Sequence, residues 1–286
     1  MMNKIARKKI NMTVRIASYC LLTVILLFPF LMTIFQALMS VDEAIQTPTK
    51  LFPSKLSLES FKIALDGQAL TGLSNTFKVV GFNVFAVTLS GYIVAYGFAK
   101  LKFVGSNFCF SLGMATMLLP SIVLMVPRYV LFVDLGWLNT LYPFTIPNLF
   151  GGGMTNIFLL TQFLRGIPNT YCDAGKIDGA SELDIAFRIV MPLSKPILLL
   201  IIFNAFTAAW NDFSGPLAYI SRSHSEKWTL AVTVFDKFQF QAVTAREKAS
   251  SLKAAMAIIM MIPSVILFGF FQKTLIEGVT FTGVKG

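Results

Sequence analysis

The stretch DAGKIDGASELDIAFRIVMPLSKP, residues 173–196, is strongly polar, although long apolar stretches lie on both sides of it. Pro192 and Pro196 stand where the second apolar stretch begins, and a proline at a helix start costs little because its missing N–H has no partner there. Gly179 lies near the centre of the segment, and glycine adopts backbone angles that most residues avoid. The pattern predicts two short helices that meet at Gly179 and lead into a long apolar helix.

Two pairs of residues in this region have the spacing of a helix cap. Thr170 with Asp173, and Ser181 with Asp184, match the pattern in which a hydroxyl caps a helix start and an acid three positions later reaches back. Each pair is expected to open one of the short helices. On the residues alone, the segment is either an interfacial loop folded against lipid headgroups or a rigid docking surface for another protein.

The composition is that of a membrane protein. Of the 286 residues, 55% are hydrophobic and 13% are charged, with a mean hydropathy of +0.70, whereas a soluble domain carries about 25% charged residues. Apolar runs long enough to cross a bilayer fall at 16–39, 75–99, 107–133, 141–165, 193–213 and 254–276. Lipid offers no partner to an unbonded backbone group, so these runs are expected to be helices. The predicted fold class is an all-α polytopic membrane protein with six transmembrane helices and the polar segment between the fourth and fifth.

Basic residues before the first apolar run indicate its orientation. They are Lys4, Arg7, Lys8, Lys9 and Arg15, and such residues gather on the cytoplasmic side. With six crossings, both termini and the polar segment are then expected in the cytoplasm. The loop over 214–253 would be external although it holds six basic residues, which runs against the same rule.

Several functional classes lack the residues they need. Although the net charge is +10, no basic cluster with interleaved aromatic residues occurs beyond the first fifteen residues, so no nucleic acid is expected as a partner. Three scattered cysteines and one histidine supply neither a disulfide framework nor a zinc site. The sequence has no G-x-S-x-G or H-E-x-x-H motif and no G-x-x-x-x-G-K-[ST] loop for ATP. The chain is expected to be no enzyme and to hold no cofactor of its own.

The polar segment resembles the cytoplasmic signature of the permeases of ABC importers, E-A-A-x-x-x-G followed by nine residues and I-x-L-P. The matching positions are Asp173, Ala174 and Gly175 for E-A-A, Gly179 for the glycine, and Ile189, Met191 and Pro192 for I-x-L-P. The glycine at 175 departs from the pattern and is expected to loosen the first helix. The resemblance implies that the segment couples the chain to an ATPase through Asp173, Ala174, Gly175, Asp178, Gly179, Ala180 and Pro192.

The likeness is strongest to the carbohydrate subgroup, which includes the maltose permeases, and covers residues 71–286. It continues through AWNDFSGPL at 209–217 and FFQKTLIEGVTFTGVKG at 270–286. The resemblance implies a bacterial inner-membrane importer with a second, different permease chain, two ATPase subunits that bind ATP and Mg²⁺, and an extracellular solute-binding protein. The implied organisation is an amino end with the first helix and first external loop over 1–70, the transmembrane domain over 71–272, and a cytoplasmic tail over 273–286.

The fifth apolar run carries a polar face. Asn204, Thr207 and Asn211 are spaced i, i+3 and i+7 and share one side of a helix, with Trp210 and Asp212 beside them. Amides, carboxylates and aromatic rings are groups that bind sugars, so these five residues are expected to line the substrate path. The alternative is that the asparagines and the threonine join neighbouring helices by hydrogen bonds, with the partner permease making most of the sugar contacts.

The alternative function is an ion-coupled secondary transporter of a small polar solute. Such transporters carry ionisable residues deep in their spans. Here Asp134 and Asp212 lie near span ends, and Lys78 and Arg128 are long enough to snorkel. Few ionisable residues therefore remain to bind a coupling ion inside the spans.

The connection after the fifth run is long for a plain loop. Its stretch EKWTLAVTVFDKF at 226–238 is expected, by the resemblance, to face the solute-binding protein with exposed aromatic residues. A solvated surface loop would have a similar composition.

Overall fold

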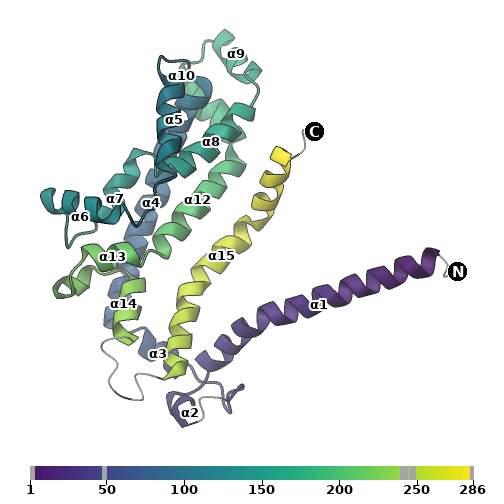
Figure 1. Ribbon diagram of the computed structural model, residues 1–286, viewed down its shortest axis with the longest axis vertical. Helices are drawn as coiled ribbons and strands as arrows, with labels where there is room; N and C mark the ends of the chain where they lie inside the picture. The colour runs from purple at the N-terminus through teal and green to yellow at the C-terminus, as the bar shows by residue number, and fades with distance from the viewer. Residues whose placement is uncertain (1–3, 47–49, 239–243, 245–248, 284–286) are drawn as a thin grey trace. The chain divides into compact units, whose positions relative to one another are not determined.

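The computed structural model describes residues 4–46, 50–238, 244 and 249–283. Within these ranges every regular element is a helix (Figure 1), so the predicted all-α fold is confirmed. The chain forms two compact units, one made of residues 1–66 with 234–262 and the other of 67–233 with 263–286. Two helices, α14 (Leu230–Asp236) and α15 (Ser250–Gly283), contribute to both units.

The first unit has a small apolar core. Its own helices are α1 (Lys4–Ala37), α2 (Val41–Gln46) and α3 (Glu59–Ala64). The buried core residues are Met39, Val41, Ala44, Ala249 and Leu252. Near this core Lys237 forms an ion pair with Asp66 at 2.7 Å and donates to the carbonyl oxygen of Ile63 at 3.2 Å. Between residues 12 and 31 the large apolar side chains of α1 are exposed, which suits a helix surrounded by lipid.

The second unit holds most of the elements. They are α4 (Gly67–Lys100), α5 (Ser106–Thr116), α6 (Met125–Asp134), α7 (Tyr142–Thr145), the 3₁₀-helix η1 (Ile146–Phe150), α8 (Met154–Gly166), α9 (Thr170–Ile177), α10 (Glu182–Asp184), the π-helix η2 (Ile185–Val190), α11 (Met191–Leu193), α12 (Lys195–Trp210), α13 (Ser214–Tyr219) and the 3₁₀-helix η3 (Arg222–Lys227).

α4 is the central helix of this unit and packs against both α8 and α12 (Figure 1). Its buried residues follow the helical repeat, and most of them are small: Ala69, Gly72, Thr76, Val79, Val80, Ala86, Val87, Gly91 and Ala95. The larger buried residues are Asn75, Asn83, Tyr92 and Tyr96. Small residues let neighbouring backbones approach closely. A Cβ atom on Gly91 would lie 3.2 Å from the carbonyl oxygen of Gly151, so the two segments are in backbone contact there.

The predicted count of six crossings stays a prediction. In the described part of the chain, three helices are long and apolar enough to cross a membrane: Met12–Ala37, Gly67–Lys100 and Ser250–Lys273. A fourth crossing is added if Glu182–Leu193 and Lys195–Trp210, which meet at 83°, are counted as one bent span. Pro196 lies in the first turn after this bend, and its ring disfavours a helix that continues straight from the preceding turn.

The apolar runs 107–133 and 141–165 are each divided into shorter helices. The first run is divided because α5 stops at Thr116, whose carbonyl group would need an N–H that Pro120 lacks. The second is divided because the glycines at 151–153 all have positive φ angles, of 91°, 64° and 95°. α8 starts directly after these glycines.

The connection after α12 is more ordered than expected. It contains α13, η3 and α14, and Trp228 is buried with its Nε1 donating to the Ile220 carbonyl oxygen at 3.0 Å. The expectation of exposed aromatic residues is therefore wrong for Trp228, although Phe235 is 37% exposed. A tryptophan ring buries a large apolar area, and its N–H usually finds a partner when the ring is buried. The expected external loop continues into 239–243 and 245–248, which lie outside the described residues.

The orientation can be tested by cysteine labelling of intact cells. Ser223 and Asp178 are both exposed, while the native Cys20, Cys109 and Cys172 would first be replaced by alanine. We expect an impermeant maleimide to label Ser223→Cys in intact cells and Asp178→Cys only after lysis, because six crossings that begin from a basic amino end in the cytoplasm would put residue 178 on the cytoplasmic side. Labelling of both sites after lysis is the control for reactivity. The reverse pattern in intact cells would reverse the orientation.

Candidate functional site: a two-helix segment and a polar pocket

The polar segment forms the two short helices that the sequence predicts, α9 and α10, joined at Gly179. Gly179 has a φ of 79°, in the left-handed region. Its N–H donates to the carbonyl oxygen of Lys176 at 3.1 Å, and the Ala180 N–H donates to that of Gly175 at 2.9 Å. This pair of bonds is a Schellman motif, which satisfies the last carbonyl groups of α9 and makes the turn rigid.

One of the two predicted helix caps is present. The Ser181 hydroxyl accepts from the Asp184 N–H at 3.2 Å, and the Asp184 carboxylate accepts from the Ser181 N–H at 3.4 Å, so the capping box is confirmed. The prediction for Thr170 is wrong, because Asn169 occupies the N-cap position of α9 and no side chain caps that helix. The Asn169 side-chain oxygen instead accepts from Lys100 Nζ at 3.0 Å.

Glycine at position 175 has a packing role. A Cβ atom there would lie 2.7 Å from Cδ1 of Ile189 and 3.2 Å from Cγ1 of Ile185, so α9 and η2 are in close contact at this point. The prediction that Gly175 loosens the first helix rests on helix propensity alone and takes no account of this contact between α9 and η2. Around Gly179, by contrast, nothing lies within 4 Å of such an atom, so that glycine is needed for its backbone angle and not for space.

The outer side of the segment is apolar and exposed. Ile177 is 86% exposed and Leu183 is 71% exposed, whereas Cys172, Ile185 and Val190 are buried against the rest of the unit. The hydrogen bond from the Ser181 hydroxyl, with the nearby Arg188, lowers the pKa of Asp184, so this carboxylate stays charged at neutral pH. The segment thus presents apolar side chains between charged ones on a rigid frame.

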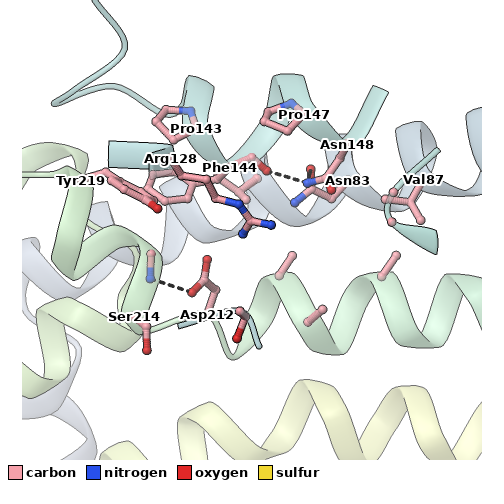
Figure 2. A pocket seen from close by; sticks show the side chains of 18 of the residues that line it. Asn83, Val87, Arg128, Pro143, Phe144, Pro147, Asn148, Asp212, Ser214 and Tyr219 are labelled. Atoms are coloured by element: carbon pink, nitrogen blue, oxygen red, sulfur yellow. Dashed lines mark hydrogen bonds between the residues drawn. The ribbon is translucent and has the colours of Figure 1, made fainter. Parts of the chain in front are cut away.

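The same unit contains a cavity of about 710 Å³, within the size range of sites for small molecules. Its walls come from α4, the stretch before α6, α6, α7, η1, α8 with the glycines that precede it, α12 and α13 (Figure 2). The polar and charged lining residues are Asn83, Ser121, Arg128, Asn148, Asn156, Asn204, Asp212, Ser214 and Tyr219.

The amide groups on one wall are held in place by hydrogen bonds. Asn148 Nδ2 donates to Asn83 Oδ1 and to the Phe144 carbonyl oxygen, both at 3.0 Å (Figure 2). Beside them the glycine turn is fixed to α4, because the Gly151 N–H donates to Ser90 Oγ at 3.0 Å. A Cβ atom on Gly152 would lie 2.4 Å from Val87, so any side chain there would push this wall away from α4.

Two opposite charges project into the cavity from different elements. Arg128 comes from α6, and Asp212 follows the end of α12 (Figure 2). Asp212 Oδ1 accepts from the Gly215 N–H at 3.0 Å, which orients the carboxylate at the start of α13. The ion pairs found among the described residues do not join Arg128 to Asp212. Both charges are thus available to a polar molecule in the cavity.

The comparison with known families identifies the chain. Residues 88–280 match the family described as "Binding-protein-dependent transport system inner membrane component". The chain belongs to this family. Its members are transport subunits and carry no cofactor of their own, so the expectation of a permease subunit is confirmed.

Relatives of this permease cover nearly its whole length. It is 31% identical to the "Melibiose/raffinose/stachyose import permease protein MelC" of Bacillus subtilis (strain 168), over 82% of this chain and 84% of MelC. It is 28% identical to the "Maltodextrin transport system permease protein MdxG" of the same organism, over 100% of both chains. A chain of a bacterial ABC transporter involved in the import of the acidic polysaccharide alginate has the same fold, with a TM-score of 0.83 at 20% identity, covering 96% of this chain and 98% of that one.

Only two of the five residues that the sequence assigns to the substrate path of the permease line the cavity. Asn204 and Asp212 line the cavity, but Thr207, Trp210 and Asn211 do not. The Thr207 hydroxyl donates to the carbonyl oxygen of Phe203, and Asn211 Nδ2 donates to that of Thr207 at 2.9 Å. Trp210 is 1% exposed and stacks on Phe206, so its ring is not open to a sugar in this conformation.

Other cavity residues were missed by reasoning from the sequence. Asn83 lies inside an apolar run, where an amide is a signal that the helix face is covered by protein. Asn148 follows Pro147 in a broken stretch, and such breaks line cavities in membrane proteins. Arg128 is long enough to snorkel, and its length does not reveal that its side chain lies at the cavity.

The backbone requirement at position 179 gives a testable prediction. We expect Gly179→Val to destabilise the purified permease by about 1–2 kcal/mol, because a left-handed angle is unfavourable for a β-branched residue, and Gly179→Asn to cost less. Gly81→Val is the matched control, since Gly81 is helical and has open space around it. Thermal unfolding in mild detergent measures all three. Equal midpoints for Gly179→Val and Gly81→Val would contradict the prediction.

Proposed function

We propose that the chain is one of two permeases of an ATP-driven importer that forms the path for a sugar or oligosaccharide delivered by an extracellular solute-binding protein. The relatives support this, because MelC, MdxG and the "Galactooligosaccharides transport system permease protein GanQ" are all named for saccharide import. The described residues contain no group of three or more histidine, cysteine or acidic side chains that could hold a metal ion. The proposal places ATP and Mg²⁺ in two separate ATPase subunits.

The observation that carries the proposal is the rigid segment of α9 and α10 with exposed apolar side chains. Ile177 and Leu183 stand out from a frame fixed by a Schellman motif and a capping box. A stiff amphipathic element can transmit a rigid-body movement from a partner into the membrane helices, which a flexible loop could not do. We assign Asp173, Ala174 and Asp178, which are exposed on the same segment, to the ATPase contact.

For the sugar path we propose the cavity in place of the polar face of α12. Sugar hydroxyl groups donate to carboxylates and accept from amides and guanidinium groups. The cavity supplies these groups through Asp212, Asn83, Asn204 and Arg128. A second permease, a different chain, completes the path in this proposal.

A transport assay distinguishes this function from ion-coupled transport. The complex would be purified by a tag on this chain, reconstituted in proteoliposomes, and supplied with the solute-binding protein encoded beside it. Uptake of labelled raffinose, maltotriose and galactotriose would be measured with ATP inside. We expect uptake of at least one sugar to require ATP and to survive an uncoupler that collapses the proton gradient. Uptake that needs the gradient and continues without ATP would overturn the proposal.

The neighbours Asn211 and Asp212 allow a sharp test of the cavity. We expect Asp212→Leu to lower sugar uptake about tenfold or more, because it removes a charged hydrogen-bond acceptor from the cavity. Asn211→Leu should retain uptake, because the Asn211 side chain is bonded to its own helix outside the cavity. Asn83→Leu, on the opposite wall, should behave like Asp212→Leu. Immunoblots of membranes confirm that each variant is assembled. Equal uptake by all three variants would place the sugar path elsewhere.

A further inference from the structure

Three polar side chains on α4 point toward the segment that follows α8. They are Tyr92, Tyr96 and Lys100, spaced i, i+4 and i+8, so they form one row along the helix. Tyr92 is fully buried and Tyr96 is 5% exposed, and both belong to the same apolar cluster as Ile167, Ile185 and Val190. The hydroxyl groups of both tyrosines are therefore fixed in position.

Tyr96 is bonded to the start of α10. Its hydroxyl donates to Glu182 Oε1 at 2.7 Å, while Glu182 Oε2 lies 3.4 Å from Lys176 Nζ on α9. Glu182 thereby connects α4 to both short helices of the segment. A hydrogen bond to a carboxylate is stronger than one between neutral groups, and this one is partly buried, with the Glu182 side chain 39% exposed.

Tyr92 and Lys100, the neighbours of Tyr96 in the row, form hydrogen bonds to the segment at two further places. The Tyr92 hydroxyl donates at 2.5 Å to the carbonyl oxygen of Ala186, which also accepts from the Met191 N–H in the wide turn of the π-helix η2. Lys100 Nζ donates to the Ile167 carbonyl oxygen at 2.6 Å and to Asn169 Oδ1 at 3.0 Å, where α9 begins. The row thus contacts the segment before α9, at α10 and at η2.

α4 is also bonded to the cavity wall, through residues nearer its amino end. Asn83 is bonded to Asn148, and Ser90 Oγ accepts from Gly151, as described above. Asn83 and Tyr96 are thirteen positions apart in α4, or about 20 Å at 1.5 Å per residue. No proline interrupts α4 between them, so a displacement at one end is carried to the other.

We propose that the hydrogen bond between Tyr96 and Glu182 is the link through which movement of the α9–α10 segment is passed to α4 and to the cavity. This inference rests on the proposed function, since it presumes an ATPase that moves the segment. Tyr96 and Glu182 are positioning residues, because they touch neither the sugar nor ATP. Their loss is expected to separate ATP hydrolysis from transport.

The test measures the number of sugar molecules imported for each ATP hydrolysed by the reconstituted complex. In Tyr96→Phe the ring stays in the apolar cluster and only the hydroxyl group is lost. We expect ATP hydrolysis stimulated by the binding protein to stay at the wild-type level, while sugar imported per ATP falls about three- to tenfold. The imported sugar is whichever of raffinose, maltotriose and galactotriose the wild-type complex takes up.

Further variants separate the link from general stability. Glu182→Gln keeps an acceptor for Tyr96 and should retain more coupling than Glu182→Ala. The double variant Tyr96→Phe, Glu182→Ala should be no worse than Glu182→Ala alone, because both changes break one bond. Tyr142→Phe is the matched control: it removes a hydroxyl group from a half-exposed ring that lies outside the cavity and the segment, and its ratio should equal the wild type.

Each outcome has a separate meaning. An unchanged ratio of sugar to ATP in Tyr96→Phe would refute the link, and so would a double variant whose losses simply add. Loss of the ATPase from purified Tyr96→Phe complex would show instead that the bond only supports docking, and would also overturn the link. Failure of the proposed function is recognised independently, because the wild-type complex itself would then show no ATP-dependent uptake of any of the sugars.

Discussion

Burial of α4 between α8 and α12 is the constraint on which the second unit depends. The helix is lined on its buried side by small residues, and at Gly91 its backbone lies against that of Gly151. Side chains along the helix then reach the elements on either side of this contact: Asn83 and Ser90 reach the cavity wall, and Tyr92 and Tyr96 reach the polar segment. The cavity and the segment are thus fixed to the same helix, although they are far apart in the chain.

The breaks in the chain have partners inside the protein. Lipid cannot satisfy a free backbone group, so an irregular stretch at membrane depth must be bonded by neighbouring elements or face a cavity. The glycine turn at 151–153 meets both conditions, since Ser90 accepts from the Gly151 N–H and Gly152 and Gly153 line the cavity. A second break lies at the start of α12, where Pro196 permits the bend that turns the polar segment away from the span.

The polar segment has a rigid backbone and carries exposed apolar side chains. Its turn is closed by backbone bonds at Gly179 and its second helix by the capping box of Ser181, whereas Ile177 and Leu183 remain exposed. Of the two predicted alternatives, an interfacial loop and a docking surface, the proposed function takes the docking surface, because a rigid frame suits that role.

Much of this architecture follows from the sequence alone. The apolar runs determined an all-helical membrane protein, the spacing of Ser181 and Asp184 determined a helix start, and the position of Gly179 determined the turn between two short helices. These features depend on neighbours along the chain, so local chemistry decides them. Only the tertiary structure decided that Trp210 is buried, that Asp212 and not Asn211 lines the cavity, and that Asn83 belongs to its wall. The reason is physical: in a membrane protein the face toward lipid and the face toward the core are equally apolar, so periodicity does not reveal which face a neighbouring helix covers.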